Sequence, residues 1–313
     1  MPTRRRFLQL SAASLASSAV AAEASFVKPT VASRIIDTHT HFYDPTRPGG
    51  VPWPSKGSQL DRPVYPQDWL AQAAPHGIRE TVVVEASKWL EDNAWILNLA
   101  AREKSIIGFV GHIEPDEADF AKQVKRFAAN PLFLGIRVGG EVFDTHRTKP
   151  EFIAAMKLLA ELGLELDVNG IRDLTQIATL AAAVPELRIV INHVGNAGDP
   201  RAIKPGWREG MAACARQPRV FCKVSALAEA TASEWGQAST DAAFYAPILD
   251  HVWESFGEDR VIYASNWPVS DKGSSYAGCF KIVSDYFTVK GREVCEKFFW
   301  KNATLAYSKL LSR

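Results

Sequence analysis

The chain has 313 residues, of which 47% are hydrophobic and 23% charged, a balance typical of a soluble protein with a substantial buried core. Its formal net charge of +1, with acidic and basic residues mixed along the chain, excludes the strongly basic surface of a nucleic-acid-binding protein. No apolar run reaches the roughly 18 residues of a membrane span. The length accommodates either two small domains or one barrel of eight β/α units.

The N-terminus has the pattern of an export signal. Residues 3–8 read TRRRFL, a weakly apolar stretch rich in Ala and Ser follows, and small residues at positions 19–24 are suited to cleavage. The pattern resembles the twin-arginine type, which implies recognition by the twin-arginine export machinery and a periplasmic protein. An amphipathic helix or a membrane anchor is the alternative. We divide the chain into a signal peptide, residues 1–25, and one folded domain, residues 26–313.

Eight short apolar runs rich in β-forming residues recur along the folded domain, and sequence with a helical period separates them. The runs cover residues 34–37, 81–86, 106–113, 132–138, 164–168, 188–194, 219–225 and 260–265. Strands that are apolar throughout and alternate with amphipathic helices favour a parallel sheet covered by helices. Eight such units predict an α/β fold, a closed or distorted (β/α)8 TIM barrel in a single domain.

Two stretches lack this alternation, residues 46–67 and 226–245. Both are rich in Pro, Gly or small polar residues, and they follow the first and the seventh predicted strands. Loops after barrel strands lie over the C-terminal mouth, where active sites are built. We therefore expect these two stretches to border the functional site.

Residues 35–45 read IIDTHTHFYDP, with two histidines one residue apart after an apolar dipeptide. If the first strand continues through them, the side chains of His39 and His41 point to the same face. Two converging imidazoles can ligate a metal, or they can polarise and deprotonate a substrate. Because an H-x-H also arises by chance, the motif alone leaves both uses open.

Each predicted strand ends in a polar residue, and a barrel gathers such residues at its mouth. In chain order they are His39 and His41, Glu85, His112, Arg137, Asp167, His193, Lys223 with Ser225, and Ser265 with Asn266. A guanidinium at a strand end suits binding of a substrate carboxylate or stabilisation of an oxyanion. A salt bridge inside the mouth is the alternative for Arg137.

Over nearly the whole folded domain the sequence resembles the amidohydrolase-related branch of the amidohydrolase superfamily, which includes sugar-acid lactonases. The resemblance is carried by IIDTHTHFYDP, LGIRV, VINHVGN, VFCKVSAL, FGEDRVIYASNWPV and NATLAYSKL. It implies a distorted barrel and hydrolysis of cyclic esters, with decarboxylases as relatives. It also implies that His39, His41 and His193 belong to the catalytic centre. In the wider superfamily such histidines hold a divalent metal, whereas lactonases of this branch can work without one, so the cofactor stays open between none and one Zn or Mn ion.

Asn266 departs from the family pattern S-D-W-P, in which the aspartate takes a proton from the attacking water. An amide has no basic site for that task, although it can orient the water. Our candidate bases are His193 first and Asp271 second, the latter five residues further along the same loop. Glu85 is a further candidate.

Substrate binding is expected from two cations and two aromatic residues. Arg137 and Lys223 suit a carboxylate or a polarised carbonyl, and the indole rings of Trp53 and Trp267 suit stacking on a sugar ring. Ordinary packing is the alternative for Lys223 and for both tryptophans.

The leading hypothesis is an exported hydrolase that opens a lactone of a sugar acid or of a small carboxylated ring by means of activated water. A metal-dependent decarboxylase of the same superfamily is one alternative. A non-catalytic binding protein is another, because the strand-8 aspartate is replaced by Asn266. The expected partners are a small-molecule substrate and the export machinery, with no nucleic acid and no stable membrane span.

Overall fold

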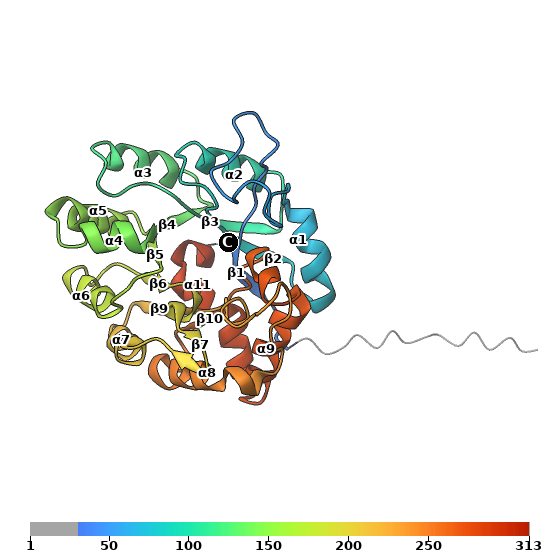
Figure 1. Ribbon diagram of the computed structural model, residues 1–313. Helices are drawn as coiled ribbons and strands as arrows, with labels where there is room; N and C mark the ends of the chain where they lie inside the picture. The colour runs from blue at the N-terminus through green and yellow to red at the C-terminus, as the bar shows by residue number, and fades with distance from the viewer. Residues whose placement is uncertain (1–30, 313) are drawn as a thin grey trace, which may run out of the picture.

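The computed structural model describes residues 31–312, so the predicted signal peptide lies outside the described residues. Eight parallel strands lie side by side in chain order. They are β1 (Ile36–Thr40), β2 (Glu80–Val84), β3 (Ile106–Gly111), β4 (Phe133–Gly139), β5 (Glu165–Asn169), β6 (Ile189–Ile191), β9 (Val220–Val224) and β10 (Val261–Tyr263). Each strand overlaps one of the eight predicted runs, and Figure 1 shows them at the centre of a ring of helices. The (β/α)8 barrel is therefore confirmed.

The barrel closes loosely between its first and last strands. β1 and β10 meet through a bridge between Thr40 and Trp267 rather than through a continuous ladder. The amide of His41 donates to the carbonyl of Trp267, and the amide of Asn266 donates to the carbonyl of His39, both at 2.9 Å. The barrel is thus distorted, and its seam passes beside the two histidines of the first strand.

Helices cover the outside of the barrel (Figure 1). They are α1 (Pro66–Ala73), α2 (Asp92–Ala100), α3 (Phe120–Ala128), α4 (Gly140–His146), α5 (Pro150–Glu161), α6 (Thr175–Ala183), α7 (Trp207–Ala215), α8 (Ala242–Phe256), α9 (Tyr276–Thr288) and α10 (Arg292–Glu296). A last helix, α11 (Asn302–Ala306), packs against the interior of the barrel instead. Short helical turns are η1 (Ala74–His76), η2 (His193–Asn196), η3 (Val269–Lys272), η4 (Lys297–Lys301) and η5 (Ser308–Ser312). The sequence did not predict the small hairpin of β7 (Gly198–Asp199) and β8 (Ala202–Ile203). Within residues 31–312 no helix is both long and apolar enough to cross a membrane.

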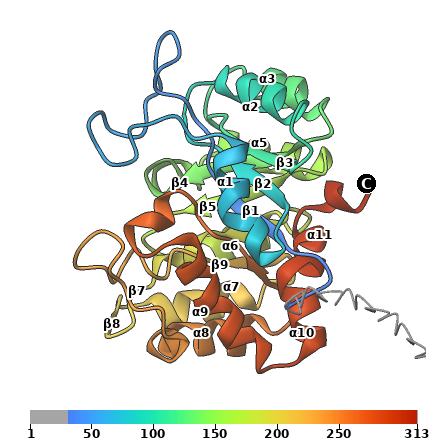
Figure 2. The ribbon, with the colours of Figure 1, turned by 90° about the vertical axis from the view of Figure 1, so that its right-hand side faces the viewer.

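The interior of the barrel is closed at one end by the C-terminal segment. Tyr307 and Leu310 pack against inward-facing apolar residues such as Ile36, Leu134 and Ile262. Figure 2 shows α11 and the C-terminus on the side opposite to the long loop that follows β1. The end of the barrel at the C-terminal ends of the strands is therefore the one available for a substrate.

Candidate active site

A pocket of about 530 Å³ opens at the C-terminal ends of the strands, and its size is within the range of small-molecule sites. We call it the mouth pocket, and it is lined by His41, Pro52, Trp53, Glu85, Ala86, Lys88, Arg137, Asn169, His193, Asn196, Ala226, Asn266 and Val269. Both predicted mouth loops contribute, through residues 52–53 and 226. The structure thus brings together five of the residues predicted from the sequence, namely His41, Trp53, Arg137, His193 and Asn266.

Four other predicted residues do not line this pocket. His39 and Lys223 are fully buried beneath it, and Trp267 is buried at the seam of the barrel. Asp271 lies in η3, where burial raises the pKa of its carboxyl to about 6. Because Asp271 does not line the mouth pocket, it is a weaker candidate base than His193.

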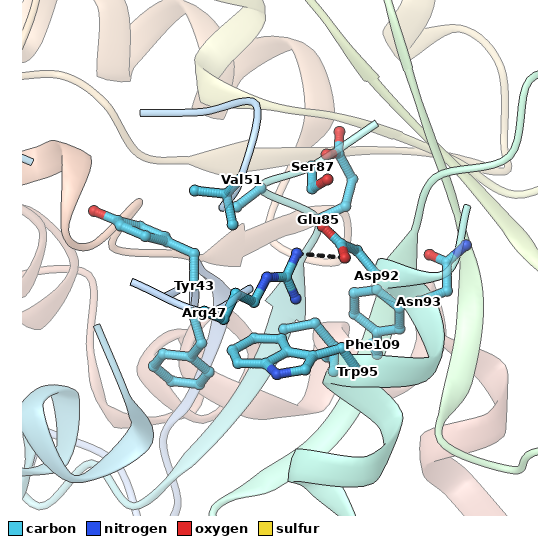
Figure 3. A pocket seen from close by; sticks show the side chains of 12 residues that line it. Tyr43, Arg47, Val51, Glu85, Ser87, Asp92, Asn93, Trp95 and Phe109 are labelled. Carbon is cyan, nitrogen blue, oxygen red and sulfur yellow. Dashed lines mark hydrogen bonds and ion pairs between the residues drawn. The ribbon is translucent and has the colours of Figure 1, made fainter. Parts of the chain in front are cut away.

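A narrower pocket adjoins the mouth pocket and shares Glu85 with it (Figure 3). Arg47 crosses this space, pairs with Asp92 and lies over the ring of Trp95, 4.9 Å from its centroid. The cavity measures about 20 Å³, room for about one water molecule. It is too small for a substrate, so the mouth pocket is the candidate active site.

The two histidines of the first strand converge on one point. Nε2 of His39 lies 3.3 Å from Nε2 of His41, and Nδ1 of His41 lies 3.0 Å from the carbonyl oxygen of Val84. A carbonyl only accepts, so His41 carries its proton on Nδ1. Nδ1 of His39 lies 3.3 Å from the ammonium of Lys223, which only donates, so His39 carries its proton on Nε2. These assignments let His39 donate to His41 with both rings neutral.

Neutral rings are also what the surroundings favour. Burial, followed by the charge of Lys223, holds the pKa of His39 well below its usual value. Burial and then Arg137 do the same for His193, and they lower the pKa of His41 to about 4. At neutral pH the site therefore presents uncharged imidazoles.

Lys223 belongs to a buried network beneath the histidines. Nζ donates to Oδ2 of Asp167 at 2.6 Å, and the side chains of both residues are 0% exposed. Tyr307 donates to the same carboxylate from the C-terminal segment, with distances of 2.9 and 3.2 Å to its two oxygens. Burial lowers the pKa of Lys223, and the Asp167 carboxylate opposes that effect and stabilises the ammonium.

His193 and Arg137 complete the reactive part of the pocket. Nδ1 of His193 lies 2.8 Å from the hydroxyl of Ser225, and its Nε2 has no hydrogen-bond partner within residues 31–312. Arg137 donates from Nε to Oε1 of Glu85 at 2.8 Å and from Nη2 to the Glu85 carbonyl at 2.9 Å. Burial disfavours the Glu85 carboxylate, but Arg137 and His112 hold its pKa below the usual value. Both the functional and the salt-bridge interpretations of Arg137 are thus compatible with the structure.

Several site residues occupy backbone conformations that are unfavourable for side chains. His193, Ala226 and Asn266 have φ angles of 57°, 53° and 63°, in the left-handed region. Each follows the end of a strand, where the chain turns away over the mouth. Such conformations cost about 1 to 3 kcal/mol each and cluster at functional sites, which agrees with the position of the pocket.

The first-strand histidines have the spacing of metal ligands, but the groups around them do not suit a divalent ion. Zinc–nitrogen bonds of about 2.0–2.1 Å allow two ligand atoms to lie 3.3 Å apart, so this separation suits an ion as well as a hydrogen bond. A metal-bound histidine donates its other N–H to a carbonyl or carboxylate, as His41 does to Val84. His39 instead faces the ammonium of Lys223, which cannot accept. In the described part of the chain, no group of three or more His, Cys, Asp and Glu residues is arranged to hold an ion. The donor set does not fit a resident divalent ion.

Sequence reasoning missed four polar residues of the site. Asn169, Asn196 and Lys88 line the mouth pocket, and Glu229 accepts a hydrogen bond from Nδ2 of Asn266 at 3.0 Å. Oδ1 of Asn169 is buried and has no hydrogen-bond partner in the described chain. The sequence signal for Glu229 was an acidic residue directly after the apolar SALA, six residues beyond Lys223.

Comparison with known proteins gives this pocket a family context. The model of the amidohydrolase family matches residues 36–308. An L-fucono-1,5-lactonase of Burkholderia ambifaria is 30% identical over 243 residues, covering 75% of this chain and 80% of that protein.

Solved structures share the fold. The crystal structure of an amidohydrolase from Burkholderia multivorans with bound zinc has a TM-score of 0.78 and 22% identity, covering 88% of this chain and 99% of that one. A 5-carboxyvanillate decarboxylase from Novosphingobium aromaticivorans, complexed with manganese, has a TM-score of 0.62 and 15% identity, covering 88% and 96%. At these identities the two structures show the common barrel alone. The family match over most of the chain, together with the related lactonase, shows that this protein is a hydrolase of the amidohydrolase family.

Proposed function

We propose that the protein opens the lactone ring of a hydroxylated sugar acid by adding water to the ring carbonyl, without a metal ion. The observation that carries the proposal is the shared pocket of a neutral imidazole, His193, and a guanidinium, Arg137. The relative named L-fucono-1,5-lactonase adds support for a cyclic ester of this class.

Each step of ester hydrolysis has a candidate group in this pocket. Nε2 of His193 takes a proton from the attacking water while Ser225 holds the other ring nitrogen. Arg137 keeps Nη1 for the carbonyl oxygen as that oxygen becomes negative, because Glu85 engages its Nε and Nη2. The imidazolium of His193 then returns the proton to the ring oxygen as the C–O bond breaks. The product is an open-chain hydroxy acid.

The charges around the pocket favour a neutral or singly charged lactone over a dicarboxylate. Two cations line the pocket, Lys88 and Arg137, and Glu85 already neutralises the second. Trp53 offers an aromatic wall whose ring centroid lies 5.7 Å from that of His41. The unpartnered Oδ1 of Asn169 suits a substrate hydroxyl, because a buried acceptor without a donor is costly.

The two alternatives have less support. A metal-dependent decarboxylase needs a firmly held cation, and the ammonium of Lys223 opposes one beside His39. A binding protein that has lost catalysis was suggested by Asn266 alone, and His193 offers a base that does not depend on that residue.

The test is a pH-indicator assay of acid release from a panel of aldonolactones, including L-fucono-1,5-lactone, with and without a chelator. Spontaneous ring opening is measured without protein and subtracted, and a His193→Asn variant at the same protein concentration tests the role of His193. Acid release that survives the chelator supports the proposal. Loss of activity with chelator and its return with Zn²⁺ or Mn²⁺ contradicts the metal-free part, and no release from any lactone by folded protein contradicts the function itself.

A further inference from the structure

A carboxylate lies directly behind Asn266, the residue that replaces the family aspartate. Nδ2 of Asn266 donates to Oε1 of Glu229 at 3.0 Å. Asn266 is 5% exposed and lines the mouth pocket, whereas the partly buried Glu229 lines a smaller neighbouring pocket. Ala226 lines both pockets. The negative charge thus lies one hydrogen bond away from the mouth.

The backbone of Asn266 is fixed by hydrogen bonds on both sides of its side chain. Its amide donates to the carbonyl of His39 at 2.9 Å, and its own carbonyl accepts from the amide of Ser270 at 3.1 Å. The last torsion of its side chain is roughly two-fold, as for any amide. Asn266 can therefore present either its oxygen or its NH2 group to the pocket.

An ionised carboxylate decides between these two orientations because it only accepts hydrogen bonds. It holds the NH2 group of Asn266 toward itself and leaves Oδ1 on the side of His41, which lines the mouth pocket together with Asn266. We propose that Glu229 is a positioning residue that acts through Asn266, fixing Oδ1 as the acceptor that orients the attacking water. The inference rests on the lactone hydrolysis proposed above. In this arrangement Asn266 and Glu229 together orient the water, and His193 takes its proton.

The surroundings of Glu229 make this control dependent on pH. Asp271 and Lys272 from η3, Tyr245 from α8 and Cys279 from α9 are the titratable groups that face it. Burial raises the pKa of Glu229 to about 7, and the bond from Asn266 opposes the rise. A protonated Glu229 can donate to Oδ1, which allows the amide to reverse. Activity should therefore fall as the pH drops through about 7, a range in which the histidines, with lowered pKa values, do not titrate.

The experiment compares wild type with Glu229→Gln, with the double variant Asn266→Asp/Glu229→Gln and with the control Glu234→Gln. Glu234 is exposed and lies in the same loop. Gln can donate as well as accept, so Glu229→Gln should lower kcat about tenfold or more, with KM nearly unchanged and the acidic limb near pH 7 lost. The double variant should recover kcat, because it places an acceptor-only group at the mouth with an amide behind it. Glu234→Gln should match wild type.

Two results would overturn the inference. One is Glu229→Gln with the kcat and acidic limb of wild type. The other comes from an infrared pH titration of wild type without substrate, in which the spectrum of Glu229→Gln identifies the signal of the Glu229 carboxyl group. That group should ionise near pH 7. Asn266→Asp should raise that midpoint, because two adjacent carboxylates resist joint ionisation. If Asn266→Asp left the midpoint of Glu229 ionisation unchanged, the pairing of residues 229 and 266 would be disproved. This titration needs no lactone, so failure of the proposed function and failure of the inference are separable.

Discussion

Replacing Lys223 with Met tests the buried cation beneath the site. Nζ donates to Asp167 at 2.6 Å, and both side chains are 0% exposed. Met keeps most of the apolar stem but removes the charge, which leaves the Asp167 carboxylate with the hydroxyl of Tyr307 as its remaining side-chain donor. Breaking a buried pair from one side costs about 3 to 5 kcal/mol. Because Tyr307 stays in place, we expect a loss of about 3 kcal/mol in the free energy of unfolding.

The assay is thermal and urea unfolding of Lys223→Met, Asp167→Asn and the double variant. At about 2 to 4 °C per kcal/mol for a large domain, Lys223→Met should melt about 6 to 12 °C below wild type. The double variant should be more stable than the sum of the two losses predicts, because neither charge is then buried alone. A loss below about 1 kcal/mol, or strictly additive losses, would refute the reasoning.

The same variant has a second readout that concerns metal binding. Without the ammonium, Nδ1 of His39 is free to carry the ring proton, and Nε2 of both first-strand histidines becomes available as a ligand. In equilibrium dialysis, Lys223→Met should therefore bind Zn²⁺ more tightly than wild type. Equal affinity of the two proteins would show that Lys223 does not oppose a metal.

Three further predictions follow from the same contacts. Arg137→Met should lower kcat/KM about 10²–10³-fold in the lactone assay, because it removes the donor proposed for the oxyanion. Asn169→Leu should reduce kcat/KM for a hydroxylated lactone while a deoxy analogue loses less. Burial raises the pKa of Glu165 to about 8, so its unfolded-state ionisation lowers stability progressively as the pH rises from about 4.5 to 8. Thermal melts should therefore show that Glu165→Gln removes this pH-dependent loss, which amounts to up to about 4 to 5 kcal/mol in the free energy of unfolding between pH 4 and pH 8.

The strands were predictable because each contains a local apolar run. The first strand shows the limit of this signal, because it continues beyond its apolar residues. It was predicted to cover residues 34–37, whereas β1 is Ile36–Thr40 and includes the fully buried Asp37. Asp37 is tolerated there because Trp69, Tyr276 and the amide of Ser265 donate to its carboxylate. These partners lie up to 239 residues away, so no local pattern could indicate that the strand continues through polar residues.

The sequence predicts which residues stand at the strand ends, but it does not predict which of them are buried and which line the pocket. Lys223 and Arg137 both appeared to be cations available to a substrate, yet one is sealed beneath His39 and the other lines the pocket. Which of them reaches the pocket depends on packing inside the barrel, which the sequence pattern does not contain. Glu229 was missed because its importance comes from Asn266, 37 residues further along the chain.

The arrangement of charges around the mouth pocket links its ion pairs, its neutral histidines and the carboxylate behind Asn266. Two carboxylates near the mouth are matched by organic cations, Asp167 by Lys223 and Glu85 by Arg137. Burial, followed by the charges of these two cations, lowers the pKa values of His39 and His193 and keeps both rings neutral. A pocket that holds neutral bases beside the Arg137 guanidinium favours a substrate that gains negative charge as it reacts. With its carboxylate behind Asn266 rather than at the mouth, the site keeps Arg137 facing the substrate while Glu229 orients the acceptor, as we propose.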